Sequence, residues 1–282
     1  MELDMQNTFI LGVGAQKSGT TWLHHYLKKS PNFNPGLMKE YHIWDALFIE
    51  SCKKYLVKNI EEQTLKGVKL TPEEFERKKD LIALRFLVQS DSLPYEQYFA
   101  ELISGKFNLT GDVTPAYAGL KAETFALIRK RLESVGFKVK VVFLMRDPVE
   151  RCLSAARMNS RKRQSESVSE RLKATYSSER MGIRTNYHRT IHELDKVFDS
   201  QDVYCGIFEE MFTASSIEKL SNFCGVPTNY AFGLEIVNSG NGSSSIDLAL
   251  RKEVSNYYSD AYKFCNERFP QTELLWKSHF SD

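Results

Sequence analysis

The chain is 282 residues long and 42% apolar, which suits one large α/β domain over residues 1–282, because hydrophobic cores divide only beyond about 250 to 300 residues. A net charge of +2 is too small to indicate binding to nucleic acid or to a membrane surface, so any basic surface must be local. The five cysteines are widely spaced and form no C-x-x-C pair, which argues against a disulfide framework and against a zinc site.

The N-terminal residues carry Glu2 and Asp4, followed by only a brief apolar run before a glycine-rich loop. A secretion signal or a membrane span requires a longer uninterrupted apolar segment. We therefore expect a cytoplasmic protein with no membrane span.

A Gly/Ser/Thr-rich loop joins the first predicted strand, which starts at Thr8, to a helix predicted over residues 20–29. Backbone N–H groups in such a loop and in the first helical turn have no intrahelical partners, and the helix dipole adds positive charge at the same place. A phosphate or sulfate is the natural ligand. The spacing of Gly14 and Gly19 is that of a nucleotide P-loop, but Lys17 precedes the second glycine and Thr20 follows it.

Residues 45–104 are predicted to be mostly helical, with a clear helix start at Thr71-Pro72, where Glu74 completes a capping box. A short strand over residues 106–112 and a helix over residues 121–135 follow. This long helical interval separates the first strand from the rest of the predicted sheet.

Residues 139–145 form a continuous apolar run, as expected for a strand that is buried on both faces of a parallel sheet. The strand ends at Arg146, and a helix capped by Asp147 begins at once, with Ser154 two turns along it. Ligands of open α/β sheets bind beyond the carboxyl ends of the strands, so we expect Arg146 to meet the first loop. A guanidinium binds phosphate bidentately, and a nearby hydroxyl adds a further hydrogen bond.

Strand, helix and strand are predicted to alternate again through residues 184–208, which makes the fold α/β with a mostly parallel central sheet flanked by helices. Two polar stretches, residues 161–180 and 238–245, have no regular pattern. Each either closes over a ligand or is a solvated connection.

The strings G-x-x-K-S-G-T-T-W-L at residues 14–23 and R-D-P-x-x-R-x-x-S at residues 146–154 resemble the two nucleotide motifs of sulfotransferases that use 3′-phosphoadenosine 5′-phosphosulfate (PAPS) and release 3′-phosphoadenosine 5′-phosphate (PAP). The resemblance implies a P-loop-like, three-layer fold. It also implies that Arg146 and Ser154 bind the 3′-phosphate. Residues that would bind the 5′-phosphosulfate are Lys17, Ser18, Gly19, Thr20 and Thr21. Trp22 either lies near the adenine or packs in the core, and Arg157 is either a further contact or a surface residue.

The string K-E-Y-H-I-W-D at residues 39–45 resembles a segment of the heparan-sulfate and related carbohydrate sulfotransferases, in which the glutamate is the general base. The resemblance makes Glu40 the base, with His42 and Asp112 as weaker candidates. The acceptor is then a hydroxyl, or an amine, of a carbohydrate or small molecule, and residues 45–104 form the acceptor-side wall. Val113 stands where this branch often has a substrate-binding lysine, which argues against a glycosaminoglycan acceptor.

Two other functions share the phosphate-binding features. A P-loop kinase or nucleotide phosphotransferase would have the same fold, but the position of Lys17 and the Arg146/Ser154 pair favour the sulfotransferase. A non-catalytic nucleotide-binding module is the second alternative, and Lys17 together with Glu40 argues against it. We predict no required metal, because the apolar strand ends in Arg146 rather than in a metal-binding acid.

Overall fold

The computed structural model describes residues 6–65, 71–161, 166–234 and 246–278. Its strands are β1 (Thr8–Gly14), β2 (Phe33–Asn34), β3 (Leu109–Val113), β4 (Lys138–Met145) and β5 (Val203–Ile207). Its helices are α1 (Thr20–Lys28), α2 (Trp44–Phe48), η1 (Glu50–Tyr55), α3 (Ile60–Leu65), α4 (Pro72–Gln89), α5 (Tyr95–Glu101), η2 (Pro115–Gly119), α6 (Ala122–Ser134), α7 (Pro148–Ser160), α8 (Val168–Thr175), α9 (Glu179–Gly182), α10 (Tyr187–Asp195), η3 (Ser200–Asp202), α11 (Ala214–Cys224), α12 (Tyr230–Gly233), α13 (Leu248–Tyr257), α14 (Ser259–Arg268) and α15 (Gln271–Leu275).

The five strands form one parallel sheet in the order β2-β3-β1-β4-β5. β1 lies in the centre, where Phe9 pairs in register with Thr110 on one side and Val139 on the other. The prediction of a mostly parallel central sheet flanked by helices is therefore confirmed. The two-residue edge strand β2 was not predicted, because it is too short for a periodic pattern.

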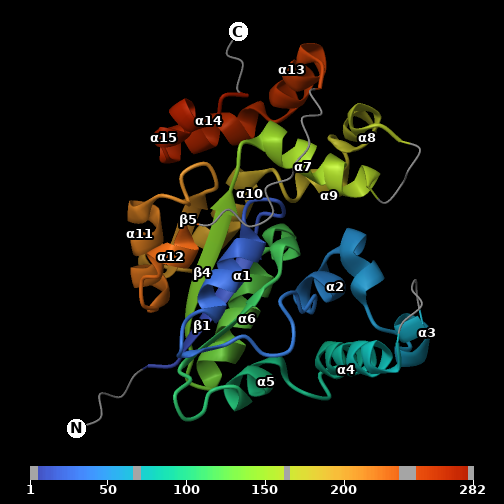
Figure 1. The fold of residues 1–282 in the computed structure, drawn as a ribbon, viewed down its shortest axis with the longest axis vertical. Coiled ribbons are helices and arrows are strands. Elements are labelled where there is room, and N and C mark those ends of the chain that lie inside the picture. Colours follow the sequence, from blue (N-terminus) through green and yellow to red (C-terminus); the bar gives the residue numbers. More distant parts are fainter. Residues whose placement is uncertain (1–5, 66–70, 162–165, 235–245, 279–282) are drawn as a thin grey trace.

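Both faces of the sheet are buried, which produces three layers. Along β1, Phe9 and Leu11 join one hydrophobic cluster with residues of α6 and α10, whereas Ile10 joins a second cluster with residues of α1 and α11. Alternate residues of β4 divide between the same two clusters, as its apolar run predicted. Figure 1 shows the layered centre, with α2, α3 and α4 on one flank and α13 to α15 beyond α7.

Most predicted elements lie within one or two residues of their observed bounds. The helix expected over residues 20–29 is α1, that over 121–135 is α6, and the strand over 139–145 is β4. β3 begins three residues later than expected, because Gly105 has a positive φ of 58° and a turn bonds Phe107 N–H to the carbonyl of Ser104. The expected capping box is present at the start of α4, where the Glu74 carboxylate accepts from the N–H of Thr71 at 2.9 Å.

The expected strand near residue 184 is wrong, and the chain there is helical or turned. The backbone N–H groups of Arg184 and Thr185 donate to the carbonyls of Met181 at 3.2 Å and Gly182 at 3.0 Å, so the backbone turns here instead of extending. The stretch 161–180 is partly regular, since α8 begins at a capping box formed by Ser167 and Glu170. The stretch 238–245 lies outside the described residues.

Candidate active site

Three chain segments meet at the edge of the sheet where the parallel strands end. The loop of residues 15–19 follows β1, and Arg146 follows β4. The segment 39–42 is fixed at the end of β3, because Val113 donates its N–H to the carbonyl of Lys39 at 3.2 Å. Since β1 lies between β3 and β4, this loop stands between Arg146 and the segment that holds Glu40.

The loop after β1 leaves main-chain donors available for a ligand. Gly19 precedes α1 with a positive φ of 93°, and a Cβ at this position would lie 2.6 Å from the Sδ of Met211. α1 begins with no side-chain cap, so its first-turn N–H groups are available for a ligand. Lys17 also has a left-handed backbone, with a φ of 72°, a conformation that costs energy for a non-glycine residue and is common at functional loops.

Two buried polar atoms of this edge have no hydrogen-bond partner among the described residues: the Oγ of Ser18 and the Nε of Arg146. Ser18 is fully buried, and an unsatisfied buried polar atom costs free energy. A ligand that carries more than one anionic group would satisfy the Ser18 hydroxyl with the first-turn amides through one group and Arg146 through another. These residues therefore fit a phosphate or phosphosulfate group.

The cations of this edge are close enough to influence one another. The Arg146 guanidinium carbon lies 4.4 Å from the centre of the Phe208 ring, and Nη1 of Arg146 donates to the carbonyl of Lys17 at 3.4 Å. Burial lowers the pKa of Lys17, and the charges of Arg146, Arg161 and Lys39 lower it further. An anion bound here would favour the charged form of Lys17.

A further buried cation, Arg151, received no role in the sequence analysis. It is fully buried on α7, and its Nη1 donates to the carbonyl of Gln16 in the loop at 3.4 Å. Its Nη2 contacts the sulfur atoms of Cys152 and Met181 rather than a carboxylate. The sequence signal for this role is the position of Arg151 as the second arginine of the R-D-P-x-x-R string. Its guanidinium supports the loop through the hydrogen bond to Gln16.

The remaining candidates are placed as follows. Trp22 is 2% exposed and stacks on Tyr26 with a ring-centre distance of 5.0 Å, so its indole packs in the core between α1 and α11. Thr20 is buried at the start of α1, and Thr21 is half-buried beside it. Ser154 is half-buried, seven residues after the cap of α7 at Asp147. A contact of Trp22 with adenine and of Ser154 with a phosphate both stay predictions.

Glu40 lies within a chain of charged side chains. Its carboxylate contacts the Nζ of Lys39 at 2.6 Å and the Nε2 of His42 at 3.3 Å, while the Nδ1 of His42 lies 2.7 Å from the Oδ2 of Asp45. Tyr55 stacks on the His42 ring at 3.8 Å between centres. Asp45 is fully buried, and its role as a partner of His42 was not predicted.

Opposing effects set the pKa values of Glu40 and His42. Burial works to raise the pKa of Glu40, but the hydrogen bond from His42 and the charge of Lys39 outweigh it and hold the pKa at about 2. Burial works to lower the pKa of His42, but its hydrogen bonds with Asp45 and Glu40 raise it overall. Glu40 is therefore an ionised carboxylate. Its side chain is 39% exposed.

Asp112 supports the segment that holds Glu40 rather than facing a ligand. It is fully buried, and it accepts hydrogen bonds from the hydroxyls of Thr114 at 2.6 Å and Tyr117 at 2.7 Å. Burial raises its pKa to about 6, although both hydrogen bonds work in the opposite direction. The Thr114 hydroxyl in turn accepts from the N–H of Tyr41 at 2.9 Å. Asp112 thus fixes the backbone next to Glu40, and the geometry favours Glu40 as the base.

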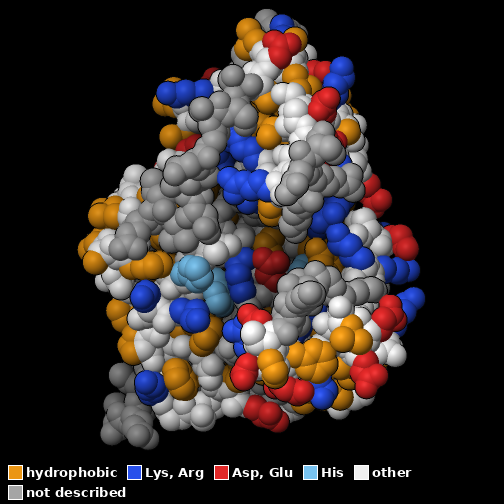
Figure 2. Space-filling view, turned by 45° about the vertical axis from the view of Figure 1, so that its right-hand side comes forward, with side chains coloured by type: hydrophobic (Ala, Val, Ile, Leu, Met, Phe, Trp, Pro, Cys, Tyr) orange, Lys and Arg blue, Asp and Glu red, His pale blue; other side chains and the backbone are white. Residues whose placement is uncertain are grey.

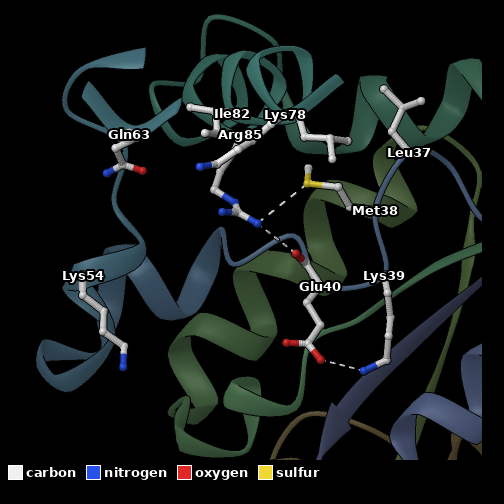
Figure 3. A pocket seen from close by; sticks show the side chains of 10 residues that line it. Leu37, Met38, Lys39, Glu40, Lys54, Gln63, Lys78, Ile82 and Arg85 are labelled. Atoms are coloured by element: carbon white, nitrogen blue, oxygen red, sulfur yellow. Dashed lines mark hydrogen bonds and ion pairs between the residues drawn. The ribbon is translucent and has the colours of Figure 1, made fainter. Parts of the chain in front are cut away.

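A cavity of about 560 Å³ opens beside Glu40. It is bounded by the segment 37–40 and by residues of η1, α3 and α4 (Figure 3). Arg85 of α4 closes one side by donating to the carbonyls of Tyr41 at 2.7 Å and Glu40 at 3.1 Å. Figure 2 shows a hollow near the middle of one face of the molecule, with Lys and Arg side chains along its edge and acidic and histidine side chains beside it.

Two searches for other kinds of site gave negative results. Within residues 6–65, 71–161, 166–234 and 246–278, no group of three or more His, Cys, Asp or Glu side chains is arranged to hold a metal ion. No helix in this part of the chain is long and apolar enough to cross a membrane.

Comparison with known proteins identifies one family. Residues 9–230 match the model of a sulfotransferase family. The chain is similar to the crystal structure of a sulfotransferase from Alicyclobacillus acidocaldarius, with a TM-score of 0.56 and 18% identity over 95% of this chain and 97% of that one. It is also similar to the sulfotransferase domain of the curacin biosynthetic pathway, with a TM-score of 0.49 and 18% identity over 84% and 81% of the two chains. A search of curated proteins found no match.

Proposed function

The chain belongs to the sulfotransferase family, and from this premise we propose that it transfers a sulfuryl group from PAPS to the hydroxyl of a carbohydrate or small-molecule acceptor. One observation carries the proposal. The sheet order places a loop with an unsatisfied buried Ser18 hydroxyl and uncapped helical amides between Arg146 and the segment that holds Glu40. Anion-binding groups therefore stand beside an ionised carboxylate that borders a cavity.

Each group of residues has a role in this reaction. Lys17, the Ser18 hydroxyl and the first-turn amides of α1 hold the 5′-phosphosulfate, and Arg146 with Ser154 holds the 3′-phosphate. PAPS supplies an activated sulfuryl group on a phosphate leaving group. Lys17 stabilises the negative charge that grows on this leaving oxygen as its bond to sulfur breaks, and holding donor and acceptor in line provides much of the acceleration.

Glu40 accepts the acceptor's proton as the new oxygen–sulfur bond forms. Its low pKa keeps it ionised throughout the neutral range. The hydroxyl becomes more acidic as its oxygen bonds to sulfur, so a weakly basic carboxylate held at the right place is sufficient. Lys39 and His42 orient this carboxylate through their contacts at 2.6 and 3.3 Å.

Two experiments test the proposal. Calorimetry should give much tighter binding of PAP than of adenosine 5′-phosphate, because only PAP carries the phosphate that Arg146 and Ser154 are proposed to bind. Incubation with radiolabelled PAPS and a panel of hydroxyl acceptors should give a labelled product, and the rate should persist in excess chelator. A magnesium requirement with ATP as donor would instead favour the kinase, and PAP binding with no turnover on any acceptor would favour the non-catalytic module.

A further inference from the structure

The lining of the cavity beside Glu40 combines hydrocarbon with positive charge. Its aliphatic side chains are those of Leu37, Met38, Leu81 and Ile82, and its cations are those of Lys39, Lys54, Lys78 and Arg85. Among the described residues that line it, Glu40 is the one acid and Gln63 the one amide. The charge of this lining is therefore strongly positive although the net charge of the chain is only +2.

One face of α4 supplies much of this lining. Lys78, Leu81, Ile82 and Arg85 recur at intervals of three and four residues, so they lie along the same side of the helix. Figure 3 shows this helix on one side of the cavity, with Glu40 and Lys54 reaching toward the cavity from two other segments. One helix therefore presents two aliphatic side chains, one ammonium and one guanidinium to the cavity.

The four cations divide by what they contact. Arg85 is engaged with the carbonyls of Tyr41 and Glu40, and the Nζ of Lys39 is engaged with Glu40, so both build the site. The Nζ of Lys78 donates to the carbonyl of Thr64 at 2.7 Å, and an ammonium has three donors, so this contact is compatible with a ligand contact. Lys54 lines the cavity from η1, and its Nζ lies 5.0 Å from the centre of the Tyr55 ring.

The aliphatic lining of the cavity favours a small aliphatic acceptor over a carbohydrate. A sugar carries a hydroxyl on most of its carbons, and each hydroxyl buried against hydrocarbon without a partner costs free energy. No aromatic ring stands among the described lining residues to receive the face of a sugar. An aliphatic chain buries favourably against the same wall. The volume of about 560 Å³ is that of a pocket for a small molecule.

We propose that the acceptor is an aliphatic hydroxy acid, whose hydroxyl lies at Glu40, whose hydrocarbon body packs on the aliphatic side chains of α4, and whose anionic group is bound by Lys54 and Lys78. This assignment rests on the proposed sulfotransferase function, because that function places the acceptor's hydroxyl at Glu40. It narrows the acceptor from a carbohydrate or small molecule to one amphipathic class.

The test is calorimetry on the PAP-loaded protein with three probes: 10-hydroxydecanoate, decane-1,10-diol and methyl glucoside. We expect the acid to bind about ten- to a hundredfold more tightly than the diol, which is the usual worth of a hydrogen bond to a charged group, and the glucoside to bind weakest. The Lys54→Gln/Lys78→Gln variant should bring the affinity for the acid down to that for the diol and leave the diol unchanged. Lys79→Gln is the matched control, because Lys79 lies on α4 outside the cavity lining and pairs with Glu76.

Equal affinity for acid and diol, or tighter binding of the glucoside, would overturn the assignment. These binding measurements need no turnover, so they separate the two proposals. If the acid binds as expected but no labelled product forms from PAPS with 10-hydroxydecanoate or any other hydroxyl acceptor, the transferase function fails while the ligand class stands. If the diol or the glucoside is sulfated as efficiently as the acid, the transferase function stands and the hydroxy-acid class fails.

Discussion

The two sides of the site are built in different ways. The nucleotide side consists of residues 14–19 and 146–154, two continuous strings at the ends of adjacent strands, and it offers main-chain N–H groups together with a few cations. The acceptor side is a cavity between the segment 37–40 and helices α3 and α4, and it offers side chains alone. On the proposed function, binding of the donor depends largely on backbone geometry, whereas selection of the acceptor depends on which side chains face the cavity.

The largest expected effect is a loss of turnover when Glu40, which lies at the boundary of these two sides, is changed. The affinity for the nucleotide should not change with it. Glu40→Gln keeps the size and polarity of the side chain but removes its basicity, so turnover should fall by about 10²- to 10⁴-fold, the usual worth of acid–base catalysis. The affinity for PAP should stay within about twofold, because Glu40 belongs to the acceptor side. Steady-state rates with labelled PAPS and calorimetry with PAP measure the two quantities. An active Glu40→Gln beside an inactive His42→Ala would move the role of base to His42.

The next effect belongs to the nucleotide side alone. Arg146→Ala removes a charged bidentate contact, so PAP should bind about 1.5 to 3 kcal/mol more weakly, which is roughly ten- to a hundredfold. Adenosine 5′-phosphate lacks the 3′-phosphate and serves as the internal control, because its affinity should change much less. A loss of equal size for both nucleotides would show that Arg146 acts by supporting the loop through its bond to the carbonyl of Lys17.

This difference in construction explains which features of the fold and of the site could be predicted from the sequence. The loop, the strand β4 and the cap at Asp147 were predictable, because each depends on a few consecutive residues. The support of the loop by Arg151 was not, since its contact with the carbonyl of Gln16 joins residues 135 positions apart. The cavity was not predicted either, because Arg85 reaches the carbonyl of Tyr41 only after α4 has packed back against the segment 37–40. The helices expected within residues 45–104 are present, but no local pattern shows which of their faces lines a cavity.

A smaller effect tests whether the backbone next to Glu40 positions its side chain without affecting the nucleotide side. Thr114→Val removes the acceptor for the N–H of Tyr41 and the hydroxyl donor to the Oδ1 of Asp112, while the Oδ2 of Asp112 keeps its bonds from Tyr117 and Tyr95. The free energy of unfolding should therefore fall by about 1 to 3 kcal/mol. Turnover should fall as well, because this backbone positions Glu40, while the affinity for PAP should not change. Thr190→Val is the matched control, since it removes a buried hydroxyl bond to the carbonyl of Ala118 away from Glu40 and should cost stability without costing turnover. Equal losses of turnover in both variants would indicate general destabilisation.

The last effect concerns His24, where the two sides approach each other. This histidine lies on α1, four residues after Thr20, and both of its ring nitrogens are buried without a partner among the described residues. Burial, together with the charges of Lys39, Lys28 and His25, lowers its pKa from the usual 6.5 to about 4 against the opposing charge of Glu40. Lys39 and Glu40 act in opposite directions, so burial remains the main cause of the lowered pKa of His24.

The sign of the pH dependence follows from this lowered pKa. The folded protein disfavours the charged imidazolium, so the contribution of His24 to stability is complete above pH 6.5 and is lost as the pH falls from about 6.5 to about 4. In His24→Gln this loss is absent. The difference in the free energy of unfolding between wild type and variant should therefore decrease by at most about 1.4 kcal/mol per pH unit across this window. Urea unfolding at pH 7.5, 6.5, 5.5 and 4.5 measures it, and the titrations of Glu40 and Asp112, present in both proteins, cancel in the difference. His24→Phe should show the same absence of pH dependence. A constant difference between wild type and both variants would mean that His24 is protonated equally in the folded and unfolded chains.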